Sequence, residues 1–300
     1  MKLATHPLWL VGFRPFFALA AVSGALLPLV WVLMLEGRSP GLAPAVPPLQ
    51  WHAHEMFFGF GWAVLGGFLL TASKNWVGIR GYHGAALGFL AAAWVFERVA
   101  MAFGAPWPPA LWWVSVFLFP ISIIAMLVWT LVRHRATDSY RDNLVFVVAL
   151  PAFLAAKLLL LDPEHFRLGA GITVGLFRVA FLLMLERTLT QFMRAAFQVG
   201  ILRDPRLDGA IKALGLLAVV ADLLPVPAAA IVELALAALL AARFLFWHPR
   251  QAMRRLDIGI MYLGYAAIVV QLFLQALERT IQPAWVGALP VHAFSFGAMG

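Results

Sequence analysis

Nine long apolar runs, separated by short breaks, dominate this chain of 300 residues. Of all residues, 63% are hydrophobic and only 12% are charged. A helix of about 20 apolar residues is long enough to cross a bilayer, and a soluble domain does not need so many such runs. We therefore predict an all-α, polytopic helical membrane protein with nine complete transmembrane helices. The predicted spans are 15–35, 51–73, 82–103, 109–132, 143–161, 169–193, 209–224, 226–247 and 257–278.

The positions of the basic residues predict the orientation of these spans. If the N-terminus is cytoplasmic, 14 of the 22 Lys and Arg residues fall on the cytoplasmic side and three fall on the other side. Because an excess of Lys and Arg marks cytoplasmic loops, we predict a cytoplasmic N-terminus. The net charge of +8 follows from these loops and does not indicate a nucleic-acid partner. The 14 are Lys2, Arg14, Lys74, Arg80, Arg133, Arg135, Arg141, Arg194, Arg203, Arg206, Lys212, Arg250, Arg254 and Arg255, and the three are Arg38, Arg167 and Arg279.

The end of the chain is unusual for a membrane protein. A further apolar run begins at Leu289 and reaches the last residue, Gly300, after only 12 residues. This is too short to cross a bilayer. We expect a single transmembrane helical domain over residues 1–300 that contains the start of a tenth helix and is truncated at its C-terminus.

A weak internal repeat suggests how the spans are grouped. Glu-Arg pairs occur at Glu97-Arg98, Glu186-Arg187 and Glu278-Arg279, near the ends of the third, sixth and ninth spans. Either these pairs mark three-helix units in alternating orientation, as in proteins built from inverted repeats, or they arose independently at helix ends.

The absence of cysteine limits the chemistry of any metal site. Disulfides, Cys-ligated zinc, iron–sulfur clusters and covalent attachment of haem through a CxxCH motif are all excluded. A metal ion must therefore use His, Met, carboxylate or carbonyl ligands.

The segment from Gln50 to Gly59 holds the densest set of such ligands, in the order Gln-Trp-His-Ala-His-Glu-Met-Phe-Phe-Gly. Ionisable residues at a membrane boundary usually mark a site. In a helix that advances about 100° per residue, His52 and Glu55 share a face, whereas His54 points about 200° away from His52. Either the first turn is irregular, or the two histidines serve different centres. Gly59 lies on the His52 face and allows close approach of a neighbouring helix or a flat cofactor.

A third histidine, His292, opens the last apolar run and is followed by small residues. On the predicted topology it lies on the outer side with His52 and His54. These three either ligate a metal or cap helices and bind interfacial water. His165 lies in an ordinary polar loop, where we expect it to be solvated. His6, His83, His134 and His248 lie on the cytoplasmic side, and we interpret them as interfacial.

Charged residues within the apolar spans are a second sign of a site. Arg178, Glu186 and Arg187 lie in the sixth span, Lys157 in the fifth, and Glu97-Arg98 in the third. One interpretation is that they pair between neighbouring helices and fix the packing. The other is that the arginines hold anionic groups, such as a substrate or the propionates of a haem.

Several motifs taken together resemble the NnrS family of bacterial inner-membrane proteins. The motifs are Phe13-Arg14-Pro15-Phe16-Phe17, Trp51-His52-Ala53-His54-Glu55-Met56 with Gly59-Phe60, Gly67-Phe68-Leu69-Leu70-Thr71-Ala72 followed by Asn75-Trp76, and His292-Ala293-Phe294 with Gly297-Ala298-Met299-Gly300. The residue before Asn75 is Lys74, where the family often has proline. The resemblance runs from the first span to the last residue.

The resemblance implies a multi-pass protein of about a dozen helices in the bacterial inner membrane. It implies haem and copper as cofactors, nitric oxide as a ligand, protection against nitrosative stress, and a link to respiratory or denitrification enzymes. On this basis we expect His52, His54 and His292 to be metal ligands. We expect Glu55 to orient an imidazole from the second coordination shell, and Arg178 to contact the cofactor.

The sequence leaves three functions open. The first is a haem and copper protein that binds, processes or senses nitric oxide. The second is a secondary transporter or channel without metal, which buried Arg/Glu pairs and inverted repeats would suit. The third is an assembly factor that delivers haem or copper to respiratory enzymes.

Overall fold

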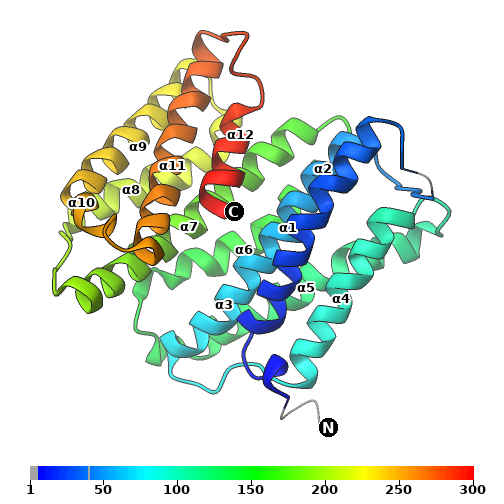
Figure 1. The fold of residues 1–300 in the computed structure, drawn as a ribbon, viewed down its shortest axis with the longest axis horizontal. Helices are drawn as coiled ribbons and strands as arrows, with labels where there is room; N and C mark the ends of the chain where they lie inside the picture. Colours follow the sequence, from blue (N-terminus) through cyan, green and yellow to red (C-terminus); the bar gives the residue numbers. More distant parts are fainter. Residues whose placement is uncertain (1–5, 40) are drawn as a thin grey trace. The chain divides into compact units, whose positions relative to one another are not determined.

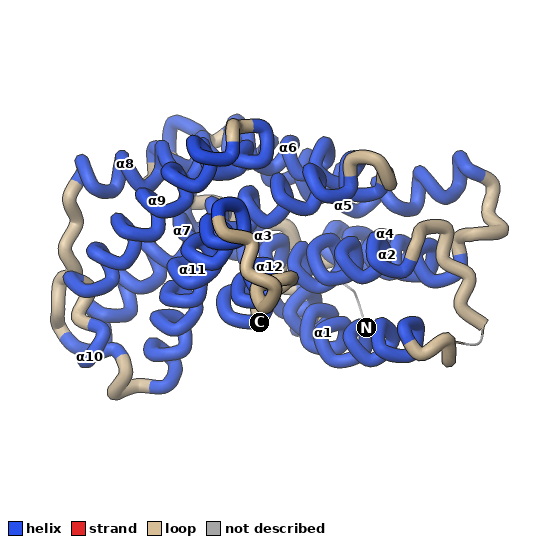
Figure 2. Tube along the Cα trace, turned by 90° about the horizontal axis from the view of Figure 1, so that it is seen from above, coloured by secondary structure: helices blue, strands red, loops and turns tan. Residues whose placement is uncertain are grey.

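The computed structural model describes residues 6–39 and 41–300, so Lys2, one of the predicted cytoplasmic residues, lies outside the described part. All regular elements in these ranges are helical (Figures 1 and 2). The chain divides into two compact units, residues 1–170 and residues 171–300. The expectation of a single domain stays a prediction.

The first unit contains the helices on both sides of the histidine segment. Its main elements are α1 (Phe13–Leu35), α2 (Pro48–His54), the π-helix η3 (Glu55–Gly61), α3 (Trp62–Val77), α4 (Ala85–Phe103), α5 (Pro109–Arg133) and α6 (Leu144–Leu161). Short 3₁₀ turns η2 (Pro7–Trp9), η4 (Arg135–Thr137) and η5 (Arg141–Asn143) lie between them. Figure 1 shows α1 packed along α2 and α3, and α4 packed along α5.

The second unit contains the rest of the chain. Helix α7 (Phe166–Phe197) starts in the last residues of the first unit and continues into the second unit. The elements that follow are α8 (Pro205–Leu217), the 3₁₀ helix η6 (Ala218–Leu223), α9 (Val226–Phe246), the short α10 (Pro249–Ala252), α11 (Leu256–Thr280), α12 (Leu289–Phe294) and the π-helix η7 (Ser295–Met299). Helix α11 packs against α9 on one side and against α12 on the other (Figure 1).

Eight helices in the described ranges are long and apolar enough to cross a membrane. They correspond to eight of the nine predicted spans, with α2, η3 and α3 forming one continuous 30-residue span over Pro48–Val77. The predicted span 209–224 differs from the others. There α8 stops at Leu217, and the 3₁₀ helix that follows has non-helical backbone angles at Val220.

The interrupted segment still runs from one end of the second unit to the other. Asp208, near its start, binds Arg243 at the end of α9, whereas Asp222, near its end, binds Arg279 at the end of α11. On a straight axis, the 13 residues of α8 and the six residues of η6 would be about 31 Å long. This matches the thickness of a bilayer core.

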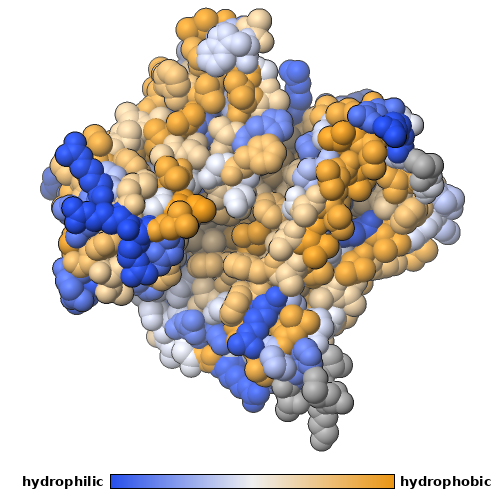
Figure 3. All heavy atoms as spheres, in the orientation of Figure 1, coloured by the Kyte–Doolittle hydropathy of each residue, from blue (hydrophilic) through white to orange (hydrophobic). Residues whose placement is uncertain are grey.

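The outward surfaces of the helices are apolar, as expected for segments in contact with lipid. In α1, Val22, Leu26 and Leu29 are all more than half exposed. Figure 3 shows hydrophobic side chains along the helices and hydrophilic side chains gathered near their ends. Such exposure would be unfavourable in water and is favourable in hydrocarbon.

Aromatic residues form the interior of the first unit. The ring of Trp62 in α3 is fully buried and meets the rings of Phe153 at 5.1 Å and Phe119 at 6.5 Å, edge to face in both cases. Phe16 of α1 stacks on Phe119 at 5.7 Å. This core holds the start of α3, and therefore the π-helix and histidines before it, in a fixed position.

Candidate functional site

The two His-Ala pairs of the sequence occupy equivalent local structures. His52 lies in α2, and the π-helix η3 begins three residues later at Glu55. His292 lies in α12, and the π-helix η7 also begins three residues later, at Ser295. π-Helical turns are rare and occur frequently at functional sites. One such arrangement is present in each unit.

The irregular turn does not bring His52 and His54 together. Helix α2 is regular up to His54, and the π-helix begins only after both histidines. The two rings consequently have different surroundings. His52 is partly exposed and stacks on Trp31 of α1, with ring centroids 4.4 Å apart. His54 is completely buried.

His54 lies between two carboxylates. Its Nδ1 is 3.1 Å from Oε1 of Glu55, and its Nε2 is 3.2 Å from Oε1 of Glu97 on α4. A neutral imidazole carries a proton on one nitrogen only, so it can donate to one of these carboxylates and presents its lone pair to the other. A metal bound at Nε2 would have to take the place of Glu97.

Two cations complete this buried cluster. Nε of Arg98 is 3.0 Å from Oε2 of Glu55, and its Nη2 is 3.1 Å from Oε1 of Glu97. Lys157 of α6 donates to Glu97 and also to the carbonyl of Val116, at 2.6 Å. With Glu55 and Glu97 ionised, two negative charges face two positive charges. Such balance is needed for charges that are removed from water.

Side chains of α4 also hold the π-helix itself. Nη1 of Arg98 donates to the carbonyl of Phe58 at 3.1 Å, and the indole of Trp94 donates to the carbonyl of Gly59 at 3.1 Å. A Cβ added at Gly59 would come within 2.9 Å of Nη1 of Arg98. The glycine therefore allows the close approach of a neighbouring helix, one of the two explanations that the sequence left open.

The ring of His292 is oriented by two contacts within its own segment. Its Nδ1 is 2.8 Å from the carbonyl of Ala288, and its ring stacks on Phe296. With the proton on Nδ1, the lone pair is on Nε2. Ligating histidines commonly donate their other nitrogen to a carbonyl in this way. The small residues after His292 pack on α11, where Gly264 lies beside Gly297.

Arg178, the residue expected to contact a cofactor, is fully buried in the second unit. Its Nη1 donates to Oε1 of Gln271, and its Nη2 donates to the carbonyl of Ala218, each at 3.0 Å. Its Nε has no hydrogen-bond partner among the described residues. Through Nη1 and Nη2, Arg178 therefore links α7 to α11 and to η6.

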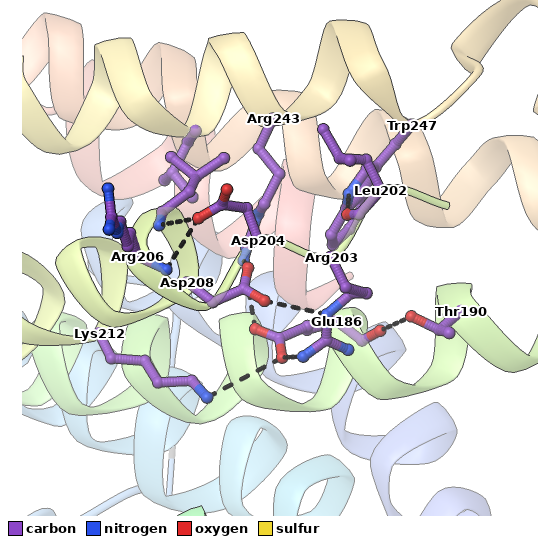
Figure 4. Close-up of polar contacts among 12 residues, drawn as sticks. Glu186, Thr190, Leu202, Arg203, Asp204, Arg206, Asp208, Lys212, Arg243 and Trp247 are labelled. Atoms are coloured by element: carbon purple, nitrogen blue, oxygen red, sulfur yellow. Dashed lines mark hydrogen bonds and ion pairs between the residues drawn. The ribbon is translucent and has the colours of Figure 1, made fainter. Parts of the chain in front are cut away.

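A second charge cluster, partly buried, surrounds Arg243 in the second unit (Figure 4). Glu186 of α7 accepts from Arg203 and from Arg243, the latter at 3.1 Å. Arg243 also lies 3.2 Å from Asp208, and Lys212 lies 3.9 Å from Glu186. Three cations here face two carboxylates. Nη2 of Arg243, a residue 1% exposed, has no hydrogen-bond partner among the described residues.

Sequence reasoning found part of these clusters. It singled out Glu97, Lys157 and Glu186 as buried charges, but it did not single out Arg243 or Asp208. The available signal was the position of Arg243 inside the apolar run 226–247.

The exposed pair of His165 and Asp162 agrees with the expectation of a solvated loop, and the hydrogen bond from His165 lowers the pKa of Asp162.

The side chains that could ligate a metal limit which metal or cofactor the protein can hold. Across residues 6–39 and 41–300, no group of three or more His, Asp or Glu side chains is arranged to hold a metal ion. Axial ligation of a haem needs only one or two imidazoles, whereas a copper ion held by imidazoles needs several that converge. His52 and His292 each offer a single imidazole, which is enough for axial ligation of a haem.

A comparison with protein-family models matches residues 7–300 to the model described as NnrS protein. The chain belongs to the NnrS family. Neither a search of curated proteins nor a search of solved structures found a match. Membership of the NnrS family indicates a bacterial membrane protein of the nitric oxide response, in a family associated with haem and copper.

Proposed function

We propose that this NnrS protein binds haem in the bacterial inner membrane, responds to nitric oxide there and protects the cell from nitrosative stress. The N-terminus is cytoplasmic, and α8 with η6 forms the ninth complete crossing. The protein works alongside respiratory or denitrification enzymes. Family membership supports the general assignment, and the paired His-Ala segments support the choice of residues.

His52 and His292 are the proposed haem ligands. Each is followed at the same spacing by a π-helix, and each stacks on an aromatic ring, of Trp31 and of Phe296. The carbonyl of Ala288 fixes the tautomer of His292 so that Nε2 can bind a metal. When bound, haem supplies an iron centre that takes nitric oxide as a ligand. Copper remains part of the proposal through the family alone.

The buried cluster around His54 positions the His52 segment. Glu55 is in contact with the ring of His54, and Arg98 ties Glu55 to α4. These contacts fix the end of α2, two residues from His52. Glu55 contacts His54 and neither proposed ligand, so its predicted role of orienting a ligating imidazole holds only if His54 is itself a ligand. Ligation by His54 itself stays a prediction, because it requires Nε2 to exchange Glu97 for a metal.

An optical titration of the purified full chain with nitric oxide tests the function. We expect a Soret band in the resting protein and a shift of that band when nitric oxide is added anaerobically. A protein that carries a stoichiometric haem but shows no shift would contradict the nitric oxide role. A protein that binds no haem after expression with haem supplementation would contradict the cofactor assignment.

A second candidate function, transport of a small anion, is favoured by the cluster in Figure 4. Arg243 lies against Glu186 and Asp208 there, and its Nη2 is a buried N–H donor without a hydrogen-bond partner among the described residues. Uptake of nitrite or nitrate by proteoliposomes that contain metal-free protein would support this function. Uptake equal to that of empty liposomes would exclude it for these anions.

A further inference from the structure

A basic pocket lies in the first unit, away from the histidine segment. It has a volume of about 280 Å³ and lies between the end of α3, the loop before α4 and the end of α5. Lys74, Arg80, His83 and His134 line it, together with apolar side chains that include Trp129. No Asp or Glu is among its lining residues.

The shape of the loop brings these basic groups together. Gly78 caps α3 in the left-handed conformation, with φ of 71°, and turns the chain back. The aliphatic stem of Lys74 packs on Gly81, where an added Cβ would come within 2.8 Å of its Cδ. Nδ1 of His83 is 3.1 Å from the carbonyl of Gly81. The loop is thus folded against the side chain of Lys74.

The two permanent cations of the pocket are not neutralised by the protein. Neither Lys74 nor Arg80 forms an ion pair within the part of the chain that the structure describes. By contrast, two other basic side chains of the same unit are paired, Arg135 with Asp138 and Lys157 with Glu97. A concave basic site without carboxylates attracts an anion.

The position of the pocket indicates which anion it takes. It lies where three apolar spans end, at Val77, Ala85 and Arg133, and this is the level of a membrane–water interface. Trp129 on its wall is 65% exposed, and Val132 on the same helix is also exposed. A ligand here therefore meets basic groups on one side and a lipid-facing apolar surface on the other.

The volume of the pocket agrees with a headgroup rather than a small ion. Its 280 Å³ is many times the volume that a single water needs, so the pocket has room for more than one small ion. Basic pockets between transmembrane helices on the cytoplasmic side bind anionic lipid headgroups. We propose that Lys74 and Arg80, in the pocket between α3, α4 and α5, bind the phosphate of an anionic phospholipid.

Lipid retention by the full chain tests the proposal. The protein is reconstituted in nanodiscs of phosphatidylcholine mixed with cardiolipin or phosphatidylglycerol, and the lipids that remain bound on release are counted by native mass spectrometry. We expect preferential retention of the anionic lipid. The double variant K74Q/R80Q should bind it about 30-fold more weakly, equal to about 2 kcal/mol at about 1 kcal/mol for each basic side chain.

Two controls make the result decisive. The variant R250Q/R254Q removes the same charge from two exposed arginines of the second unit and should keep the preference. The variant Lys74→Arg, which keeps the charge, should also retain the lipid. Equal binding by wild type and K74Q/R80Q would overturn the proposal, as would an equal loss in R250Q/R254Q. Displacement of the lipid by dilute inorganic phosphate would show that the site takes a free anion instead.

Discussion

Lys157 of α6 donates a hydrogen bond to Glu97 of α4, and both side chains are completely buried. Between them they join two transmembrane helices at the level of His54. Because Glu97 also lies 3.2 Å from Nε2 of His54, this pair connects the packing of the first unit to its histidine segment.

Breaking this pair should destabilise the protein strongly. Lys157→Met or Glu97→Gln leaves a buried charge without its main partner, which costs about 3–5 kcal/mol. The double variant K157M/E97Q should recover a substantial part of that loss. Thermal unfolding in detergent, analysed as a double-mutant cycle, measures the coupling. Additive effects of the two substitutions would contradict the pairing.

A side chain at Gly59 should displace the guanidinium of Arg98. In Gly59→Ala the new Cβ would meet the end of the Arg98 side chain, which would have to shift away from Glu55 and Glu97, so we expect a loss of about 1 kcal/mol of stability. Gly88 of α4 is the matched control, because an added Cβ there meets nothing within 4 Å. Gly88→Ala should be neutral or slightly stabilising, since alanine favours a helix. The melting temperatures of the two variants test this expectation. An unchanged melting temperature for Gly59→Ala would contradict the close contact between Gly59 and Arg98.

Arg243 should be essential for the packing of the second unit. Its side chain bonds to Glu186, Asp208 and Tyr265, three residues on three different helices. Arg243→Met removes these bonds and leaves the carboxylates less well paired, so we expect a loss of about 3–5 kcal/mol. Arg250→Met, at an exposed position, should leave the melting temperature unchanged. Comparable melting temperatures for the two variants would contradict this role.

The sequence predicted the spans well because the length of an apolar run directly reflects the thickness of the bilayer. It also predicted that His52 and His54 point in different directions, because that follows from rotation about a regular helix. The break after Leu217 was not predicted. The 3₁₀ helix that follows has non-helical backbone angles at Val220, and a hydropathy pattern does not report backbone angles.

The partners of the buried charges could not be predicted from the sequence. Glu186 and Arg243 are 57 residues apart, and which ends of which helices meet depends on tertiary packing. The π-helix that begins at Glu55 could not be predicted from the sequence either. Its carbonyls are held by Trp94 and Arg98 of another helix, and the spacing of residues within one segment carries no trace of such donors.

The central claim is that His52 and His292 bind haem, and the haem content of single variants tests it most directly. Four proteins are purified in parallel: the wild-type chain, His52→Ala, His292→Ala, and His165→Ala as a control at an exposed histidine. The haem content per polypeptide is measured from the optical spectrum. The account predicts that wild type and His165→Ala carry haem, while His52→Ala and His292→Ala lose most of it and remain folded. Full haem content in both His52→Ala and His292→Ala would contradict the account.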